Sequence, residues 1–136
     1  MPALTADRAT AERKGDEFSY DAAAVECFAG GIAMLNASGN VTPGATATGQ
    51  ICVGMFAEHV DNSGGSAAAV KAKVKSGVFR FGNSGSADAI TKANIGDTCY
   101  IVDDQTVALT NGTNTRSAAG TIVDVDSVGV WVRMGL

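Results

Sequence analysis

The stretch Ala118–Met134, which reads AAGTIVDVDSVGVWVRM, decides the fold. Two runs of alternating residues flank a break at residues 127–129. A two-residue alternation of β-branched and aromatic residues around a turn rich in Asp, Ser and Gly is typical of a β-hairpin. The second run holds Trp131, the only tryptophan. We expect a closing hairpin that packs Trp131 inward and leaves Asp124 and Asp126 in water.

Length and composition favour one hydrophobic core with few large side chains. A chain of 136 residues fits one domain and can bury most of its unfolded surface without disulfides. Only five Phe, two Tyr and one Trp are present, while 17 Gly favour tight turns over long helices. Charged residues make up 18%, below the usual quarter. This balance favours a protein that covers part of its surface in an oligomer or assembly; the alternative is an ordinary polar surface of Ser, Thr and Asn.

Further short strands, separated by turn signals about every ten residues, are predicted upstream of the hairpin. The stretch Ala69–Phe81 is expected to form one long strand whose three lysines, at alternate positions, face water. Such lysines also suit an edge strand. A bulge at Ser76 and Gly77 would turn Phe79 and Phe81 into the core. The other expected strands are Ile32–Asn36, Val41–Thr42, Ile51–Val60, Asp97–Val102 and Thr106–Leu109.

The pattern as a whole predicts a mainly β fold: a small β-barrel or β-sandwich-like single domain with one short helix and an extended N-terminal arm. The helix is expected as a single turn within Ala89–Asn94. The polar stretch Met1–Glu17 is the arm, and Phe18–Leu136 is the β-rich domain. Phe18 and Tyr20 mark the junction. The arm is either a frayed terminus or a segment that becomes ordered on a neighbouring protein.

Candidate catalytic and metal-binding residues do not form a known constellation. Cys27, Cys52 and Cys99 are odd in number, widely spaced and without a CxxC pair, so we expect buried small side chains in a reducing compartment. His59 is the sole histidine and is interpreted as structural. The GxSxG and P-loop motifs are missing. We therefore expect no enzyme and no cofactor.

Two aspartates of the hairpin loosely match the start of a calcium loop. Asp124, Asp126 and Gly129 have suitable spacing, but Val128 stands where Asp or Asn is required. Gly135 stands where a bidentate Glu is required. We therefore expect no metal site.

Net charge and hydropathy exclude two classes of partner. The net charge is −4 and no basic run stands out, so we expect no nucleic-acid binding. No stretch approaches the roughly 18 apolar residues of a membrane span, so we expect no membrane partner. The N-terminal stretch also lacks the apolar core of a signal peptide.

Several stretches, taken in order, resemble the small head decoration, or capsid cement, proteins of tailed bacteriophages. In that family a Phe-Arg-Phe-like strand end, an ITxAxIG turn, a YxxDDxTV hairpin and a closing VDxxGVWV hairpin follow one another. An ADRxTxxRxGDxFSY opening and a VDNSGG loop are also similar. The matching stretches here are Ala6–Tyr20, Val60–Gly65, Gly77–Gly85, Ile90–Ala108 and Ala119–Met134.

This resemblance implies a structural virion protein without catalysis. Such proteins are commonly trimers that bind the major capsid protein on the outside of the head, between capsomers, and stabilise it against the pressure of packaged DNA. They are made in the cytoplasm of the bacterial host. The resemblance and the arm together make Arg8, Arg13, Phe18 and Tyr20 the candidate capsid-binding residues.

Two alternatives stay open. One is a different structural component of the virion, in head completion or the tail. The other is a small β-barrel carbohydrate-binding module, which should show exposed aromatic residues. An inward Trp131 would count against the second.

Overall fold

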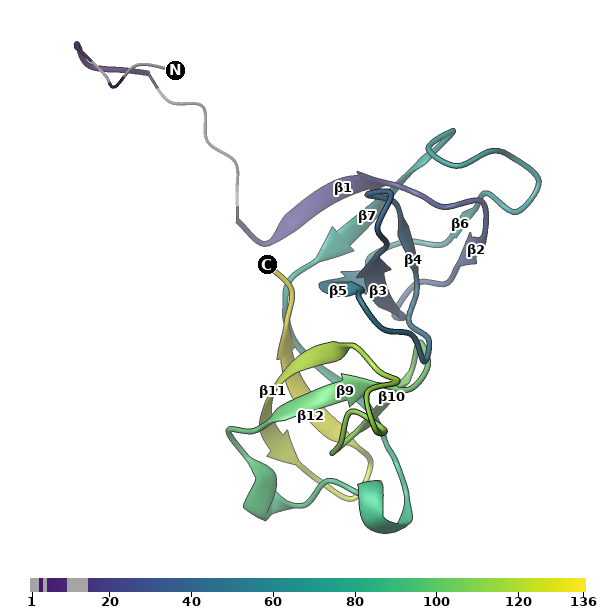
Figure 1. Cartoon of the computed structure of the whole chain (residues 1–136), viewed down its shortest axis with the longest axis vertical. Coiled ribbons are helices and arrows are strands. Elements are labelled where there is room, and N and C mark those ends of the chain that lie inside the picture. The colour runs from purple at the N-terminus through teal and green to yellow at the C-terminus, as the bar shows by residue number, and fades with distance from the viewer. Residues whose placement is uncertain (1–2, 4, 10–14) are drawn as a thin grey trace.

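The computed structural model describes residues 3, 5–9 and 15–136, which are mainly β (Figure 1). The predicted fold class is confirmed: a small domain with a closed five-stranded barrel. Two 3-10 helices take the place of the one predicted helix. The elements are β1 (Glu17–Asp21), β2 (Glu26–Cys27), β3 (Ile32–Leu35), β4 (Val41–Pro43), β5 (Ile51–Phe56), β6 (Val60–Asp61), β7 (Lys71–Lys75), β8 (Gly77–Asn83), η1 (Ser86–Asp88), η2 (Lys92–Asn94), β9 (Thr98–Ile101), β10 (Thr106–Ala108), β11 (Ala118–Val125) and β12 (Val130–Met134).

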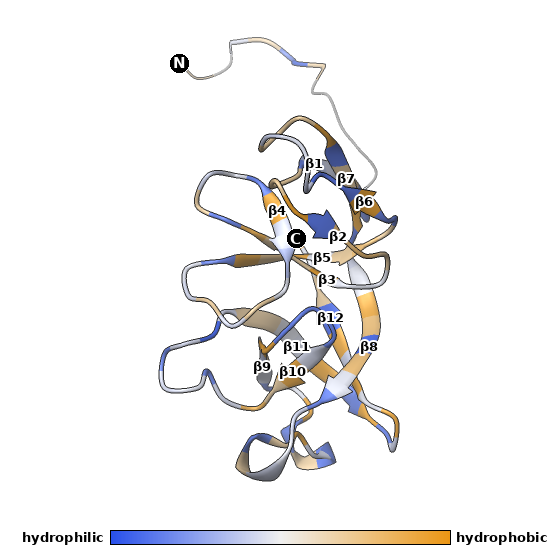
Figure 2. Cartoon of the chain, turned by 90° about the vertical axis from the view of Figure 1, so that its right-hand side faces the viewer, coloured by the Kyte–Doolittle hydropathy of each residue, from blue (hydrophilic) through white to orange (hydrophobic). Residues whose placement is uncertain are grey.

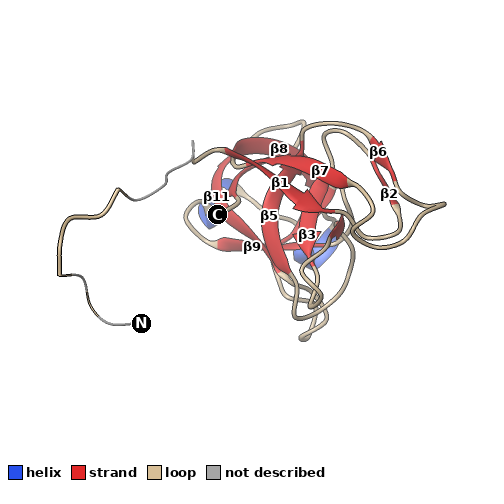
Figure 3. Cartoon of the chain, turned by 90° about the horizontal axis from the view of Figure 1, so that it is seen from above, coloured by secondary structure: helices blue, strands red, loops and turns tan. Residues whose placement is uncertain are grey.

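The strands form two main layers and a small flap. The N-terminal sheet has the order β1-β7-β5-β3-β4, and the C-terminal barrel closes in the order β10-β8-β12-β11-β9. Within the barrel, β10 runs parallel to β8 and antiparallel to β9. The flap is the pair β2-β6, which lies to one side of the sheet in Figure 3. The sheet therefore sits against one end of the barrel, as Figure 1 shows.

Two strands of the sheet, β3 and β5, contribute residues to two hydrophobic cores. Successive residues of a strand point to opposite faces. Ile32 and Met34 of β3 join the core that fills the barrel, whereas Ala33 joins the core on the other face of the sheet. In β5, Cys52 faces the barrel and Val53 faces away from it. Figure 2 shows orange, hydrophobic segments along strands of both layers. Burial of both faces explains why β3 and β5 read as nearly continuous apolar runs.

A bulge in β5 lies beside the glycine of this strand. The register between β3 and β5 shifts between Ala33 and Met34, so Val53 is an extra residue on β5. Gly54 has a φ of +135°, and a Cβ there would lie 2.1 Å from the Lys75 carbonyl oxygen. Only glycine permits this approach between β5 and β7. The strand then ends at Phe56, earlier than the predicted Val60.

The single long strand predicted over residues 69–81 is wrong. The chain leaves the sheet after β7 and enters the barrel with β8, so Ser76 connects two layers. The consequence expected of a bulge still holds, because Phe81 is buried and Phe79 packs against the barrel core. In β8 the alternation of inward and outward side chains starts again. A count of alternate positions that assumes one continuous strand cannot detect this restart.

The lysine face of β7 is confirmed, but β7 is not an edge strand. Ala72 and Val74 are buried while the three lysines are exposed. Because β7 lies between β1 and β5, its lysines face the acidic residues of β1. Lys71 Nζ lies 3.0 Å from Asp21 Oδ1. Lys73 Nζ also lies 3.7 Å from Glu17 Oε1, so two of the lysines form cross-strand ion pairs instead of protecting an edge.

The closing hairpin is confirmed, with a correction to its faces. Register shifts within β11 put Ala119, Ile122 and Val125 in the barrel core. On β12, Val130 and Val132 point inward, so Trp131 lies on the outer face and is only half-buried. The prediction that Trp131 packs inward is wrong because the two valines, not the tryptophan, occupy the inward positions.

Candidate interaction surfaces

The predicted capsid-binding residues fall into two places. Phe18 and Tyr20 are half-buried on β1, opposite Val74 and Ala72, with ring centroids 6.3 Å apart. Tyr20 packs against the core of the sheet and so anchors β1 to the folded body. Arg8 is exposed, in a segment drawn apart from the body in Figure 1.

Arg13 lies outside the described residues. The structure places only the other three candidates, and it does not bring these into one patch. Arg8 is an exposed cation outside the folded body, whereas Phe18 and Tyr20 are half-buried rings on β1.

The outer face of the barrel carries a cluster of Trp131, Arg80 and Asp126. Trp131 Nε1 donates to Asp126 Oδ2 at 2.9 Å, and Arg80 Cζ lies 5.4 Å from the indole centroid. Arg80 Nη1 is 3.8 Å from the same carboxylate. The hydrogen bonds from Trp131 and from two turn amides, with the nearby Arg80 charge, lower the pKa of Asp126 below its ordinary value. An inward Trp131 would count against sugar binding. Because the indole lies half-buried on the outer face, that argument does not apply.

The two hairpin aspartates serve structural contacts. Asp126 Oδ1 accepts hydrogen bonds from the Val128 and Gly129 amides at 2.8 and 2.9 Å, which forms the turn. Asp124 Oδ1 accepts from its neighbour Val125 and lies 3.5 Å from Lys92 Nζ. Over residues 3, 5–9 and 15–136, no group of three or more His, Cys, Asp or Glu side chains is arranged to hold a metal ion.

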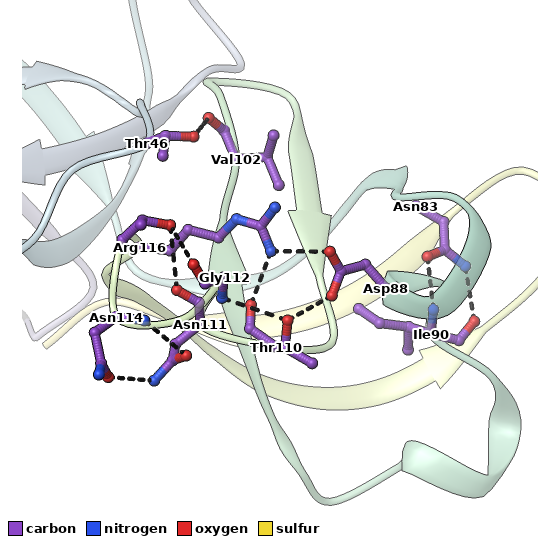
Figure 4. Close-up of polar contacts among 11 residues, drawn as sticks. Thr46, Asn83, Asp88, Ile90, Val102, Thr110, Asn111, Gly112, Asn114 and Arg116 are labelled. Atoms are coloured by element: carbon purple, nitrogen blue, oxygen red, sulfur yellow. Dashed lines mark hydrogen bonds and ion pairs between the residues drawn. The ribbon is translucent and has the colours of Figure 1, made fainter.

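A polar network ties the loop 110–117 to η1 at the far end of the barrel (Figure 4). Arg116 Nη1 donates to Asp88 Oδ2 at 3.2 Å and to the Thr110 carbonyl at 3.0 Å. Asp88 also accepts from the Thr110 hydroxyl. The Thr110 and Arg116 contacts lower the pKa of Asp88. The sequence alone does not reveal this network, because nothing in TNGTNTRS shows which residue its arginine reaches.

The same loop turns through three residues with left-handed backbone. Gly112, Thr113 and Asn114 have φ values of 64°, 60° and 63°. Asn111 supports the turn, accepting from the Asn114 amide at its side-chain oxygen at 3.1 Å. Left-handed backbone at Thr is uncommon, so the loop depends on these polar contacts for its shape.

Further contacts join the loop before β5 to the barrel. Thr46 Oγ1 donates to the Val102 carbonyl at 2.9 Å, and Ser117 Oγ donates to the Ala47 carbonyl at 2.7 Å. The backbone amide of Gln50 donates back to Ser117 Oγ at 3.1 Å. These contacts hold the sheet and the barrel in one arrangement.

His59 is exposed and takes part in a small aromatic stack. Its Nε2 lies 2.7 Å from Glu26 Oε2, which joins the two strands of the flap region. The imidazole stacks on the ring of Phe28, with centroids 5.4 Å apart and an interplanar angle of 18°. The sequence interpretation of His59 as structural agrees with these contacts. Phe28, which sequence reasoning missed, is 55% exposed.

The described residues form at least two surface grooves. The first, of about 410 Å³, is lined by Phe28, Ala29, Gly30, Gly31, Asp104 and Gln105. The second, of about 500 Å³, lies between the start of β5 and the strands β11 and β12, and includes the exposed Ile51 and Arg133.

The cysteines lie where the sequence predicted. All three are free and buried, and Cys52 and Cys99 belong to the barrel core. Burial raises the pKa of Cys52 to about 11 and that of Cys99 to about 12. These thiols therefore act as small apolar side chains.

In the described part of the chain, no helix has the length and apolar character needed to cross a bilayer. Comparisons with family models, curated proteins and solved structures found no significant match to this chain.

Proposed function

We infer that this chain is a capsid decoration protein: a structural virion component that binds the outside of a phage head between capsomers and stabilises it against internal DNA pressure. The major capsid protein is its proposed partner, and the working form is a homotrimer. The protein is proposed to act without catalysis, and to reach the virion exterior from the cytoplasm of a bacterial host.

The observation that carries the proposal is the ordered set of family-like motifs. The stretches Gly77–Gly85, Ile90–Ala108 and Ala119–Met134 contain all five strands of the barrel. Resemblance is therefore concentrated in one closed structural unit, and it extends to the sheet through Ala6–Tyr20 and to the flap through Val60–Gly65. A shared order of motifs within one unit supports a common fold more strongly than any single motif.

The physical properties of the body suit this role. The sheet and the barrel share buried residues of β3 and β5 and are joined by loop contacts, so load can pass between the layers. A cement protein needs such a stiff body, because it must resist separation of its neighbours. Repeated sites on a capsid add avidity, which makes modest single contacts effectively permanent.

The N-terminal segment is the proposed contact with the capsid. Residues 5–9, including Arg8, are exposed. Tyr20 fixes the root of this segment on the core of the sheet, where the Ser76 backbone amide donates to the Asp16 carbonyl at 2.9 Å. In the proposal, Arg8 and Arg13 contact the capsid and the two rings transmit the load to the body.

Deletion of residues 1–14 tests the role of the arm while keeping β1 and the Asp16 contact. Purified full-length and shortened proteins are added to expanded, empty heads that lack this protein, and bound copies are counted by quantitative mass spectrometry. We expect hundreds of copies per head for the full-length chain and at least a tenfold loss for the deletion. The double variant R8A/R13A should lose part of this binding. The variant K71A/K73A removes the same charge from the sheet and should bind normally.

Three results would count against the proposal. Unchanged occupancy of the deletion variant would remove the arm from the mechanism. A copy number of about a dozen or fewer per virion would instead support a head-completion or tail component. Failure of the full-length protein to bind heads at all would overturn the decoration function. Light scattering of the purified protein checks the trimer separately.

A further inference from the structure

The cleft between the β2–β3 connection and the β9–β10 turn is a candidate ligand site. It measures about 410 Å³ and is lined by Phe28–Gly31 on one side and by Asp104 and Gln105 on the other. Ligand sites combine apolar surface with a few convergent polar groups. This cleft brings an aromatic ring, a carboxylate and a primary amide together from segments more than 70 positions apart in the sequence.

The ring of Phe28 is held in place from behind. His59 stacks on it at 5.4 Å, and Glu26 holds the imidazole through a 2.7 Å contact. His59 does not line the cleft, whereas Phe28 does, and Phe28 remains 55% exposed. Burial of a large apolar ring is favourable, so an exposed ring held in a fixed position offers a ligand favourable contact surface.

The polar side of the cleft is fixed through its backbone and free at its side chains. The Gln105 amide donates to Asp103 Oδ1 at 2.9 Å, and the Ile32 amide donates to the Asp104 carbonyl at 2.8 Å. Within residues 3, 5–9 and 15–136, the side chains of Asp104 and Gln105 make no hydrogen bond or ion pair. Their oxygen and nitrogen atoms are therefore available to a ligand.

Two glycines keep the cleft open. A Cβ at Gly30 would meet nothing within 4 Å, and Gly30 has a φ of +87° that disfavours other residues. A Cβ at Gly31 would lie 3.5 Å from Asp104 Oδ2. Apart from the methyl group of Ala29, the wall between Phe28 and Asp104 carries no side chain, which leaves a ligand access to both.

We propose that this cleft binds a neutral saccharide. The C–H face of a pyranose ring stacks on an exposed aromatic ring, while a carboxylate and an amide bind neighbouring hydroxyl groups. Phe28, Asp104 and Gln105 supply these groups, and the cleft volume suits one or two sugar rings. The carboxylate disfavours anionic sugars. A lysine side chain of a partner would use Phe28 and Asp104 but would leave the Gln105 amide without a role, so the saccharide fits the whole lining better.

The test is a titration of ¹⁵N-labelled protein, followed by ¹H–¹⁵N spectra, with glucose, galactose, N-acetylglucosamine and maltose. We expect shifts at the amides of Ala29, Gly30 and Gln105 for at least one sugar, with a Kd on the order of 1–10 mM. The indole signal of Trp131, on the barrel face, should stay unchanged. Phe28→Ala and Asp104→Asn should each weaken binding at least tenfold. Ile51→Ala, which removes an exposed apolar residue from the other groove, should bind normally.

Three outcomes would overturn the proposal. No shift with any of the four sugars at 50 mM would remove the saccharide. Shifts with Nα-acetyl-lysine amide, which keeps its side-chain ammonium, and none with sugars would assign the cleft to a cationic side chain of a protein partner. Retained sugar binding in a folded Phe28→Ala variant would place the site elsewhere. The head-binding assay separates this inference from the decoration function, because Phe28→Ala is expected to keep full occupancy of expanded heads.

Discussion

Arg80 lies over the indole of Trp131, with its Cζ 5.4 Å from the ring centroid, on the outer face of β8 and β12. The indole in turn donates to Asp126 at 2.9 Å. The only tryptophan therefore connects two barrel strands with the turn between β11 and β12. Its packing against a cation and a carboxylate stabilises this corner from outside the core.

Replacing Trp131 with Phe should raise the pKa of Asp126. The variant keeps a ring beneath Arg80 but removes the hydrogen bond that lowers this pKa most. A carboxyl group with a lowered pKa stabilises the fold above its ordinary value of 3.8, and this stabilisation is lost as the pH falls through the folded value. We therefore expect W131F to lose less stability than wild type between pH 5 and pH 2.

The pKa of Asp126 is measured from its carboxyl ¹³C shift as a function of pH. The free energy of unfolding is measured by urea unfolding at each pH. Val128→Ala, on the same turn, is the control and should leave both unchanged because only its backbone amide contacts Asp126. An unaltered Asp126 pKa in W131F would show that the indole hydrogen bond does not control this group.

Substitution of Gly54 by Ala should cost about 2–3 kcal/mol of unfolding free energy. The new Cβ would lie 2.1 Å from the Lys75 carbonyl oxygen, at a φ of +135° that alanine disfavours. A loss of this size lowers the Tm of a domain of this length by roughly 10 °C. Gly85→Ala is the matched control, because its Cβ would meet nothing within 4 Å. Equal melting temperatures for the two variants would contradict the close approach of β5 and β7.

The sequence predicted the fold class and the closing hairpin because both depend on local patterns. Alternating burial on β7 and the turn at Asp126 follow from residue spacing and turn chemistry alone. Gly54 was also recognisable, since a glycine within an apolar strand commonly marks a bulge. These features need no knowledge of distant parts of the chain.

Features that depend on distant pairing could not be predicted. The change of layer at Ser76 appears only once β7 pairs with β1 and β8 pairs with β12. Trp131 faces outward because of the valines on either side of it, and aromatic character alone gave the opposite answer. The cleft joins Phe28 to Asp104 across 76 positions, so only the folded chain brings the two residues together.

Replacing Arg116 with Ala should loosen the loop 110–117 without unfolding the barrel. Its guanidinium joins Asp88 to the Thr110 carbonyl, while its Nε is buried without a hydrogen-bond partner in the described chain. In the variant, the loop can open without breaking these contacts, so it opens more often. We therefore expect proteolysis within the loop to accelerate about tenfold. Mass spectrometry of the fragments locates the cut. The control is Arg133→Ala, which removes an exposed arginine from the barrel face and should be cleaved at the rate of the wild type. Equal cleavage rates for the two variants would exclude a role for Arg116 in holding the loop.

The three thiols should be unreactive in the folded protein. Burial raises the pKa of all three, to about 11 for Cys52 and about 12 for Cys99. A shift of two units from the ordinary 9.0 reduces the reactive thiolate of Cys52 about 100-fold at pH 8, and burial slows access further. We therefore expect Ellman's reagent to modify all three thiols at least about 100-fold faster in 8 M urea than in buffer. Ala67→Cys places a thiol in an exposed loop and should add one fast-reacting group to the folded protein. Rapid modification of wild type in buffer would contradict the buried thiols and the core that they help to fill.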